Sequence, residues 1–387
     1  MNNPVKKIIF FVQGEGRGHM TQAISMYDTL IKKGHRISAV VIGSGGINTT
    51  PAFFFERIKA PIVKLRTPNF VTDKNNKSIK VVPTLIQSIS NLNTYHNSLR
   101  LIRLLLEEHK PDLVINFYDV LIGLYYSLNK CKIPMVSIAH QYIYLHPDFV
   151  FPKGHLADRW SVYLYTRLTS AGSKKRLALS LYPLKQVKTK ENVVVVPPLL
   201  RNEVLSLKTE KKNFYLVYLV NGGYMADIIK WHKNNTHIEL HCFADVKKIE
   251  GKINYEHENF GMHQISDKEF LEKMSEARGL VSTAGFESIC EAMYLGKPVL
   301  MVPVEGHYEQ FCNARDAFDA GAGIYDSWFN INKLVQYTEV AAYENNNFKR
   351  WATNSAETIY KEITHVLNSV HDAAPSGSSG QVREAMG

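Results

Sequence analysis

The chain has 387 residues, of which 45% are hydrophobic and 21% are charged, and its formal net charge is +10 at pH 7. These fractions are ordinary for a soluble globular protein, and the longest apolar runs fall far short of the roughly 20 residues that cross a bilayer. Because single cores rarely grow beyond about 250–300 residues, the length predicts two domains.

The cysteines and the first residues indicate a cytoplasmic protein. Cys131, Cys242, Cys290 and Cys312 are widely spaced and form no C-x-x-C pattern, as expected of reduced core residues. The N-terminus lacks the long apolar segment and the small-residue cleavage site of a secretory signal.

The excess positive charge is gathered in clusters, at residues 74–80, 174–176, 185–190 and 208–212. They can be solvated surface, or they can attract an anionic membrane surface or an anionic acceptor. Peripheral attachment to the inner face of a membrane therefore stays open beside a purely cytoplasmic location. No recognised DNA- or RNA-binding motif accompanies the charge, so we expect no nucleic acid partner.

The N-terminal segment is predicted to be a β-α-β unit. The apolar run 8–12 predicts a buried strand, which breaks at the glycine loop 14–19, G-E-G-R-G-H. Helix 20–33 and strand 37–42 follow, separated by Gly34. The loop alone would suggest a dinucleotide fingerprint, but it ends in Gly-His and no acidic residue closes the second strand, so we expect a different ligand.

Strands and helices alternate along the remaining chain, with a charged segment at 199–213 that suits an interdomain linker. In the first half we expect strands 62–65, 112–117, 135–139 and 193–196 and helices 85–109, 121–130 and 158–168. In the second half we expect strands 214–220, 238–243, near 253–255, 279–283 and 298–304, and helices 225–233, 267–277, 286–295 and 309–320, then a terminal helical region.

This order predicts an α/β protein with two Rossmann-like domains, each with a parallel sheet covered on both faces. We place the N-terminal domain at 1–200 and the C-terminal domain at 201–370. Residues 371–387 form a tail of flexible composition outside the fold. Ligands in such sheets bind beyond the carboxyl ends of the strands, where both glycine turns of the chain lie.

The most informative stretch is 282–288, S-T-A-G-F-E-S, a strand end, a small-residue turn and the opening of a helix. Backbone N–H groups at such a turn, with the positive end of the helix dipole behind them, can hold a diphosphate. Glu291 lies between one and two turns further along, placed to accept hydrogen bonds from ribose hydroxyls. Together these features predict a nucleotide-sugar site.

These motifs resemble those of the GT-B superfamily of nucleotide-sugar glycosyltransferases over nearly the whole chain. The resemblance includes plant UDP-sugar-using enzymes and the peptidoglycan N-acetylglucosaminyltransferase. It implies two Rossmann-like domains facing across a cleft, with acceptor bound by the N-terminal domain and donor by the C-terminal domain. It also implies inversion at the anomeric carbon, no cofactor besides the nucleotide sugar, and no essential metal.

Carried over by residue, the resemblance assigns most of the predicted donor site. The diphosphate turn contains Thr283, Ala284, Gly285, Phe286 and Ser288, with Glu291 as the ribose ligand. Glu309-Gln310 would bind hydroxyls of the donor sugar, and Asn221-Gly222-Gly223 would bring backbone amides to the phosphates. Gly16 and Gly18 of the N-terminal loop would also serve the donor.

Two departures bear on the donor. Plant relatives carry a histidine where this chain has Thr283, so one phosphate contact changes to a hydroxyl or backbone group. Their tryptophan that stacks on uracil has no obvious counterpart, the matching region being near 262–265. These motifs therefore predict the binding of a diphosphate more firmly than they predict the nucleobase of the donor.

The resemblance also implies a base for the acceptor proton. His19 matches a histidine that acts as general base in plant relatives, and Asp119 lies roughly where those enzymes place the aspartate that orients it. For His19 the alternative is a helix-start histidine that contacts phosphate, and for Asp119 it is a helix N-cap before Leu121.

His140-Gln141 can line the acceptor side, but we expect a surface loop there. The many aromatic residues between 117 and 165 are expected to be core rather than an acceptor surface.

The sequence thus predicts an inverting, metal-independent glycosyltransferase that moves a sugar from a nucleotide sugar, most simply a UDP-hexose or UDP-N-acetylhexosamine, to a hydroxyl acceptor. The acceptor can be a lipid, a glycan or a small molecule. Two alternatives stay open: an isomerase resembling UDP-N-acetylglucosamine 2-epimerases, and a non-catalytic nucleotide-sugar-binding protein.

Overall fold

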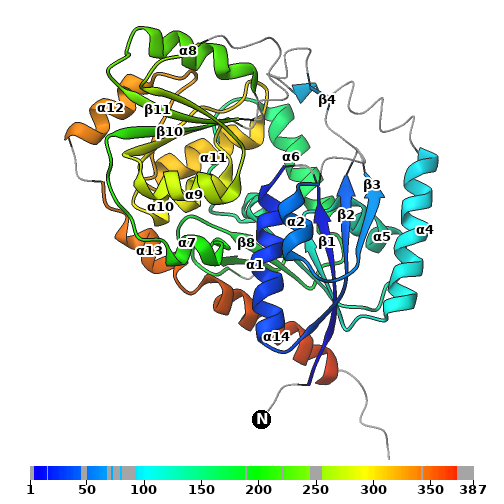
Figure 1. The fold of residues 1–387 in the computed structure, drawn as a ribbon. Coiled ribbons are helices and arrows are strands. Elements are labelled where there is room, and N and C mark those ends of the chain that lie inside the picture. Colours follow the sequence, from blue (N-terminus) through cyan, green and yellow to red (C-terminus); the bar gives the residue numbers. More distant parts are fainter. Residues whose placement is uncertain are drawn as a thin grey trace, which may run out of the picture.

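The protein forms two α/β lobes joined side by side (Figure 1). The computed structural model describes residues 4–14, 16–44, 50–67, 71–72, 79–80, 92–187, 190–219, 222–244, 255–340 and 343–372. Among them, no helix is both long enough and apolar enough to cross a membrane.

The N-terminal lobe is built on a seven-stranded sheet of order β3-β2-β1-β6-β7-β8-β9, in which every pair is parallel. Its strands are β1 (Lys7–Gln13), β2 (Arg36–Ser44), β3 (Ile62–Arg66), β6 (Leu113–Phe117), β7 (Met135–Ala139), β8 (Lys175–Leu179) and β9 (Val193–Val196). Its helices are α1 (Gly18–Lys32), α2 (Ala52–Arg57), α4 (Leu92–His109), α5 (Val120–Leu128), the 3-10 helix η1 (His140–Leu145) and α6 (Leu156–Thr169). A separate antiparallel pair joins β4 (Val71–Thr72) to β5 (Ile79–Lys80).

The C-terminal lobe repeats this plan with a six-stranded parallel sheet of order β12-β11-β10-β13-β14-β15. Its strands are β10 (Phe214–Leu219), β11 (Glu239–Ala244), β12 (Phe260–Gln264), β13 (Gly279–Ser282), β14 (Val299–Met301) and β15 (Gly323–Tyr325). The helices are α7 (Asn202–Ser206), η2 (Gly222–Tyr224), α8 (Met225–Lys233), α9 (Asp267–Glu276), α10 (Phe286–Tyr294), α11 (Tyr308–Asp319), α12 (Ile331–Val340), α13 (Asn346–Ala352) and α14 (Ser355–Asp372). The predicted pair of parallel sheets is confirmed.

The strand orders place a switch point at the centre of each sheet. In the first sheet the chain goes outward from β1 on one side and from β6 on the other, and in the second it does so from β10 and β13. Crevices for ligands form beyond the carboxyl ends of strands at such points. The glycine loop follows β1 and the small-residue turn follows β13, so each predicted motif lies at a switch point.

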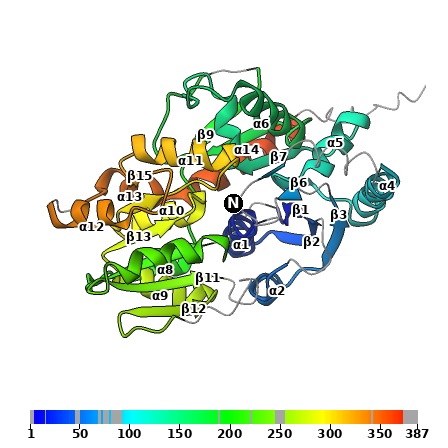
Figure 2. The same ribbon diagram turned by 90° about the horizontal axis from the view of Figure 1, so that it is seen from above.

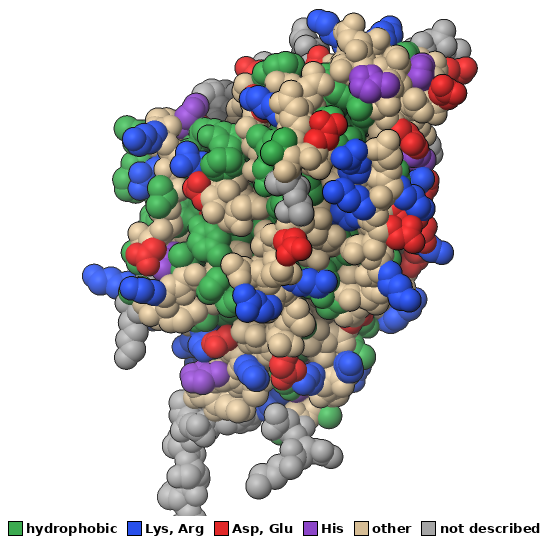
Figure 3. All heavy atoms as spheres, turned by 90° about the vertical axis from the view of Figure 1, so that its left-hand side faces the viewer, with side chains coloured by type: hydrophobic (Ala, Val, Ile, Leu, Met, Phe, Trp, Pro, Cys, Tyr) green, Lys and Arg blue, Asp and Glu red, His purple; other side chains and the backbone are tan. Residues whose placement is uncertain are grey.

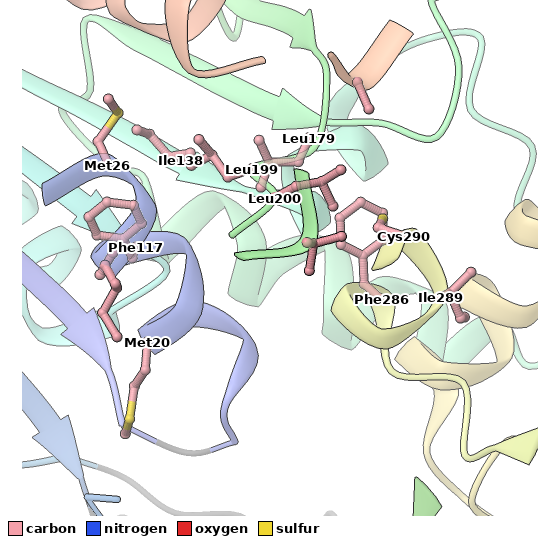
Figure 4. Packing of buried hydrophobic residues seen from close by; sticks show 14 of the residues in the cluster. Met20, Met26, Phe117, Ile138, Leu179, Leu199, Leu200, Phe286, Ile289 and Cys290 are labelled. Atoms are coloured by element: carbon pink, nitrogen blue, oxygen red, sulfur yellow. The ribbon is translucent and has the colours of Figure 1, made fainter. Parts of the chain in front are cut away.

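The lobes share a hydrophobic core that runs through the segment joining them. Leu199 and Leu200, at 0% and 2% exposure, belong to one buried cluster with α1 residues and with Phe286 and Cys290 of α10. Figure 4 shows these two leucines beside Phe286 and Cys290. Burial of this apolar surface is the main force that joins the two lobes.

The last helix returns to the first lobe. Helix α14 packs against α1 and β9, and it runs below α1 in Figure 1. Lys33 forms an ion pair with Glu357 (2.7 Å), and His35 Nε2 lies 3.0 Å from the Tyr360 hydroxyl. Residues 355–372, most of which fall within the range expected for the second domain, therefore contact the N-terminal sheet.

Some elements differ from the sequence-based expectation. Strand β8 was not predicted, because its first residues are basic; Arg176 is nevertheless buried, donating to Ser170 and to the backbone of Glu191. The strand expected near 253–255 is found instead at β12, while residues 251–254 lie outside the described part of the chain.

Several residues of the predicted basic clusters are buried or paired with acidic side chains, so the clusters are only partly solvated surface. Arg176 is buried and Lys175 pairs with Glu362, while Lys212 pairs with Glu276 at 2.6 Å. Cluster 74–80 falls largely outside the described residues. On the face shown in Figure 3, lysines and arginines are spread among acidic side chains.

Gly123 of α5 marks a close approach between α5 and the end of α6. A Cβ at this position would lie 2.0 Å from the carbonyl oxygen of Leu168 and 2.7 Å from that of Thr169. We expect Gly123→Ala to lower the free energy of unfolding by about 1–3 kcal/mol or more, because backbone must move to accept the methyl group. Denaturant titration would measure this, with Ser127→Ala on the same helix expected to stay within about 1 kcal/mol of wild type. Equal effects of the two changes would contradict the close approach.

Candidate active site

The turn between β13 and α10 presents a helix N-terminus without a side-chain cap. Ala284 has φ +56°, a left-handed conformation that is strained for a residue other than glycine and is common in functional turns. Gly285 takes the N-cap position, and no side chain of the described residues caps the helix there. The first amides of α10 therefore lie at the positive end of the helix dipole, an arrangement that favours a phosphate group.

Two hydroxyls belong to the same turn. Thr283 is fully buried, and its Oγ1 has no hydrogen-bond partner among the described residues. Ser288 Oγ lies 3.2 Å from Ser282 Oγ and donates to the Gly285 carbonyl at 3.0 Å. Both hydroxyls therefore belong to the segment that leads into and opens α10.

Glu291, the predicted ribose ligand, is paired with an arginine from the joining segment. Arg201 donates from Nε and Nη2 to the two carboxylate oxygens, at 2.6 and 2.7 Å, and Glu291 is only 2% exposed. Sequence reasoning did not find Arg201. Each carboxylate oxygen keeps a second lone pair beyond its bond to Arg201.

His19 is the second residue of α1 and lies half-buried, and α1 contacts the start of α10 through Gln22 and Glu287. Its Nδ1 is 3.4 Å from Gln22 Oε1, its Nε2 is 3.5 Å from Gln141 Nε2, and its ring stacks on Tyr118 with centroids 5.4 Å apart. Burial lowers the pKa of His19. The imidazole is therefore neutral at pH 7 and able to accept a proton.

Asp119 caps α5. Its Oδ1 accepts hydrogen bonds from the amides of Leu121 (3.0 Å) and Ile122 (3.1 Å), and its Oδ2 faces Gly43, where a Cβ would lie 1.9 Å away. Burial raises the pKa of Asp119 to about 7. These contacts match the N-cap alternative, and they give no support to Asp119 as the residue that orients His19.

Gln141 connects the two lobes at the site. Its Nε2 donates to Glu309 Oε1 at 2.9 Å, besides lying near His19. The predicted base and the predicted sugar-binding glutamate are therefore joined through one amide. The expectation that His140-Gln141 forms a surface loop is wrong, since the two residues are only 1% and 5% exposed. The C-terminal lobe covers them, and nothing local in the sequence signals that.

His140 is part of the same interface. Its ring stacks on Phe286 with centroids 3.8 Å apart, and its Nδ1 lies 2.8 Å from the Leu179 carbonyl. Burial lowers the pKa of His140 to about 4, so it is neutral at pH 7. The ring is therefore buried against the first turn of α10.

Glu287, the second residue of α10, was part of the predicted motif but received no role. Gln22 Nε2 donates to its Oε1 at 2.6 Å, and its Oε2 is buried with no partner in the part of the chain that the structure describes. Burial, helped by the nearby carboxylate of Glu291, raises the pKa of Glu287 to about 8. A neutral carboxylic acid therefore lies in the first turn of α10 at pH 7.

The other predicted residues surround this centre. A Cβ on Gly18 would lie 3.1 Å from Glu287 Cγ, so the glycine loop passes tightly against α10, while Gly16 is exposed with φ +80°. Gln310 Oε1 accepts from the Val304 amide at 2.8 Å and so fixes the loop after β14. Gly222 and Gly223 open η2 after β10, whereas Asn221 lies outside the described residues.

A family model described as glycosyl transferase family 1 matches residues 6–356. The chain belongs to this family. Two uncharacterized glycosyltransferases, from Methanosarcina acetivorans and Methanosarcina mazei, are each 23% identical to it; the alignments cover 89% of this chain and 89% and 92% of the relatives. The protein is therefore a glycosyltransferase.

Solved structures of glycosyltransferases share its fold. The glycosyltransferase of kitacinnamycin superposes with a TM-score of 0.65 at 14% identity, covering 94% of this chain and all of the other. UGT89C1 of Arabidopsis thaliana in complex with UDP-L-rhamnose gives 0.60 at 12% identity, covering 95% of this chain and all of the other. MurG of Acinetobacter baumannii gives 0.53 at 15% identity, covering 94% and 100%. These likenesses confirm the expected two-domain GT-B fold.

Proposed function

We propose that this family member is an inverting, metal-independent enzyme that transfers a sugar from a UDP-hexose or UDP-N-acetylhexosamine to a hydroxyl acceptor. The observation that carries the proposal is the line of contacts from His19 through Gln141 to Glu309, opposite the uncapped start of α10. Similar plant structures are complexes with UDP-L-rhamnose, or with UDP-2-fluoro-glucose and pterostilbene, and they support the choice of a UDP-sugar as the proposed donor.

In the proposed reaction, His19 takes the proton of the acceptor hydroxyl as its oxygen attacks the anomeric carbon. The bond from that carbon to the diphosphate oxygen breaks on the opposite face, which inverts the configuration. The negative charge that develops on the diphosphate is stabilised by the first amides of α10 and by the Thr283 hydroxyl. Glu309 orients hydroxyls of the donor sugar, while Glu291, held by Arg201, accepts from the ribose.

Turnover with a panel of UDP-, GDP- and dTDP-sugars and hydroxyl acceptors tests this function. NMR of the product is expected to show an anomeric configuration opposite to that of the donor, and turnover is expected to survive a metal chelator. Conversion of the sugar nucleotide without an acceptor would instead indicate an isomerase, and tight donor binding without any turnover would indicate a binding protein.

Glu287 makes donor binding depend on pH. Its raised pKa of about 8 means that the carboxyl is protonated at neutral pH and ionises as the pH rises through 8. The ionised form would repel a diphosphate at the start of α10, since Gln22 is neutral and Arg201 is already paired with Glu291. We expect UDP-sugar affinity to fall above about pH 8, by up to roughly tenfold per pH unit, and to stay nearly constant in Glu287→Gln.

Calorimetry across this pH range measures the effect. The exposed Glu305 supplies a matched control, because Glu305→Gln should keep the pH dependence of the wild type. A wild-type affinity that does not change with pH, or an unchanged slope in Glu287→Gln, would contradict the role given to Glu287.

A further inference from the structure

Helix α6 exposes a continuous row of large hydrophobic side chains. Leu156, Trp160, Leu164 and Leu168 are 68%, 61%, 57% and 36% exposed, and each follows the last by four positions, so they lie along one side of the helix. Val150, just before the helix, is 77% exposed. Single exposed apolar residues are normal on a protein surface, but a contiguous row of this length indicates an interaction site.

Arginines outnumber acids on α6, whose charged residues are Arg159, Arg167 and Asp158, the last with a side chain that is 42% exposed. The other exposed residues of the helix are Ala157, Arg159, Ser161 and Arg167. Arg159 and Arg167 each follow a residue of the hydrophobic row by three positions, which places them beside it. The single acid of the helix, Asp158, lies 3.4 Å from the His155 imidazole, and Arg167 pairs with Glu191 at 3.2 Å at the edge of this face. Lys153 and Lys174 are exposed just before and after the helix.

The opposite side of α6 is connected to the active site. The Thr166 hydroxyl lies 2.7 Å from that of Tyr118, whose ring stacks on His19. The helix also packs against η1, which carries Gln141, and against α11, which carries Glu309. Figure 2 shows α6 on the outer edge of the molecule. A partner bound to this hydrophobic row would therefore be separated from the predicted acceptor side of the active site only by α6.

We propose that the outer face of α6 docks on a bilayer that contains anionic lipid and so brings a lipid-linked hydroxyl acceptor to the active site. The docking itself follows from the exposed face, while the acceptor class rests on the proposed function. Leucines and a tryptophan flanked by arginines are the side chains that enter a headgroup region, where the rings and alkyl chains meet apolar tails and the guanidinium groups meet phosphates. The helix has 14 residues, so it lies in the plane of the membrane rather than across it.

Co-sedimentation with vesicles tests the docking. The full chain is expected to bind vesicles of phosphatidylcholine with phosphatidylglycerol, to bind pure phosphatidylcholine more weakly, and to lose binding as salt is raised. Trp160→Glu/Leu164→Glu is expected to weaken partition at least roughly tenfold. Leu104→Glu on α4 is the matched control, because Leu104 is 47% exposed on another helix, and it should bind like wild type.

Three results would overturn the proposal: no binding of the wild type to anionic vesicles, equal binding of the α6 variant, or a wild-type dimer that the α6 change separates, which would make a second copy the occupant of this face. Turnover on a water-soluble acceptor should be unchanged in the α6 variant. This measurement separates the docking proposal from the proposed function. Docking can fail while turnover on a water-soluble acceptor still supports the transferase activity.

Discussion

Replacing His19 with alanine is expected to lower turnover by roughly 10²–10⁴-fold, the usual contribution of a positioned general base. Burial lowers the pKa of His19, so its ring is neutral at pH 7 and can accept a proton, and the ring is held by Gln22, Gln141 and Tyr118. Donor affinity should change little, because in the proposed site the diphosphate is bound by α10. Steady-state kinetics and calorimetry with a UDP-sugar would measure the two quantities on the same preparation.

A matched change elsewhere controls for a general effect of removing an imidazole. His365 is exposed on α14, so His365→Ala should keep wild-type kinetics. Near-wild-type turnover in His19→Ala would remove His19 as the base. A large loss of donor affinity without loss of turnover at saturation would instead indicate that His19 contacts phosphate.

Replacing Glu291 with alanine is expected to weaken nucleotide-sugar binding at least roughly tenfold, since charged hydrogen bonds contribute about 1.5–3 kcal/mol each. The same change leaves the Arg201 side chain, only 15% exposed, without its bidentate partner, and loss of one partner from a buried pair typically lowers the free energy of unfolding by about 3–5 kcal/mol. Asp267 lies 3.8 Å from Arg201, so we expect the lower end of that range. Calorimetry and denaturant unfolding would measure the two effects.

The double change Arg201→Ala/Glu291→Ala separates stability from binding. Removing both charges should restore much of the stability, because no uncompensated charge stays buried, but it should not restore affinity. If the double variant binds donor like wild type, Glu291 is a structural ion-pair partner and not a ribose ligand.

The parts of the site that sequence could predict are local in the chain. The turn at 283–285 was found because small residues separate a strand from a helix, and its strained Ala284 and uncapped α10 follow from that same short segment. The order of strands and helices likewise predicted both sheets and placed the two motifs at strand ends.

What sequence reasoning missed depends on contacts between distant residues. Arg201 and Glu291 are 90 positions apart, and Gln141 and Glu309 are 168 apart, so neither pairing leaves a local pattern. A surface loop was expected at His140-Gln141 because the residues that bury this pair belong to the other lobe. Strand β8 was hidden by its basic start, whose charges are satisfied by Glu362 and Glu191.

The central claim is that the N-terminus of α10 holds the diphosphate of a nucleotide sugar opposite His19. A crystal structure with UDP or a non-transferable UDP-sugar tests it most directly. The proposed site predicts phosphate oxygens within hydrogen-bond distance of the amides of Phe286, Glu287 and Ser288, with the ribose on Glu291. A diphosphate bound away from the turn at 283–285 would contradict the account.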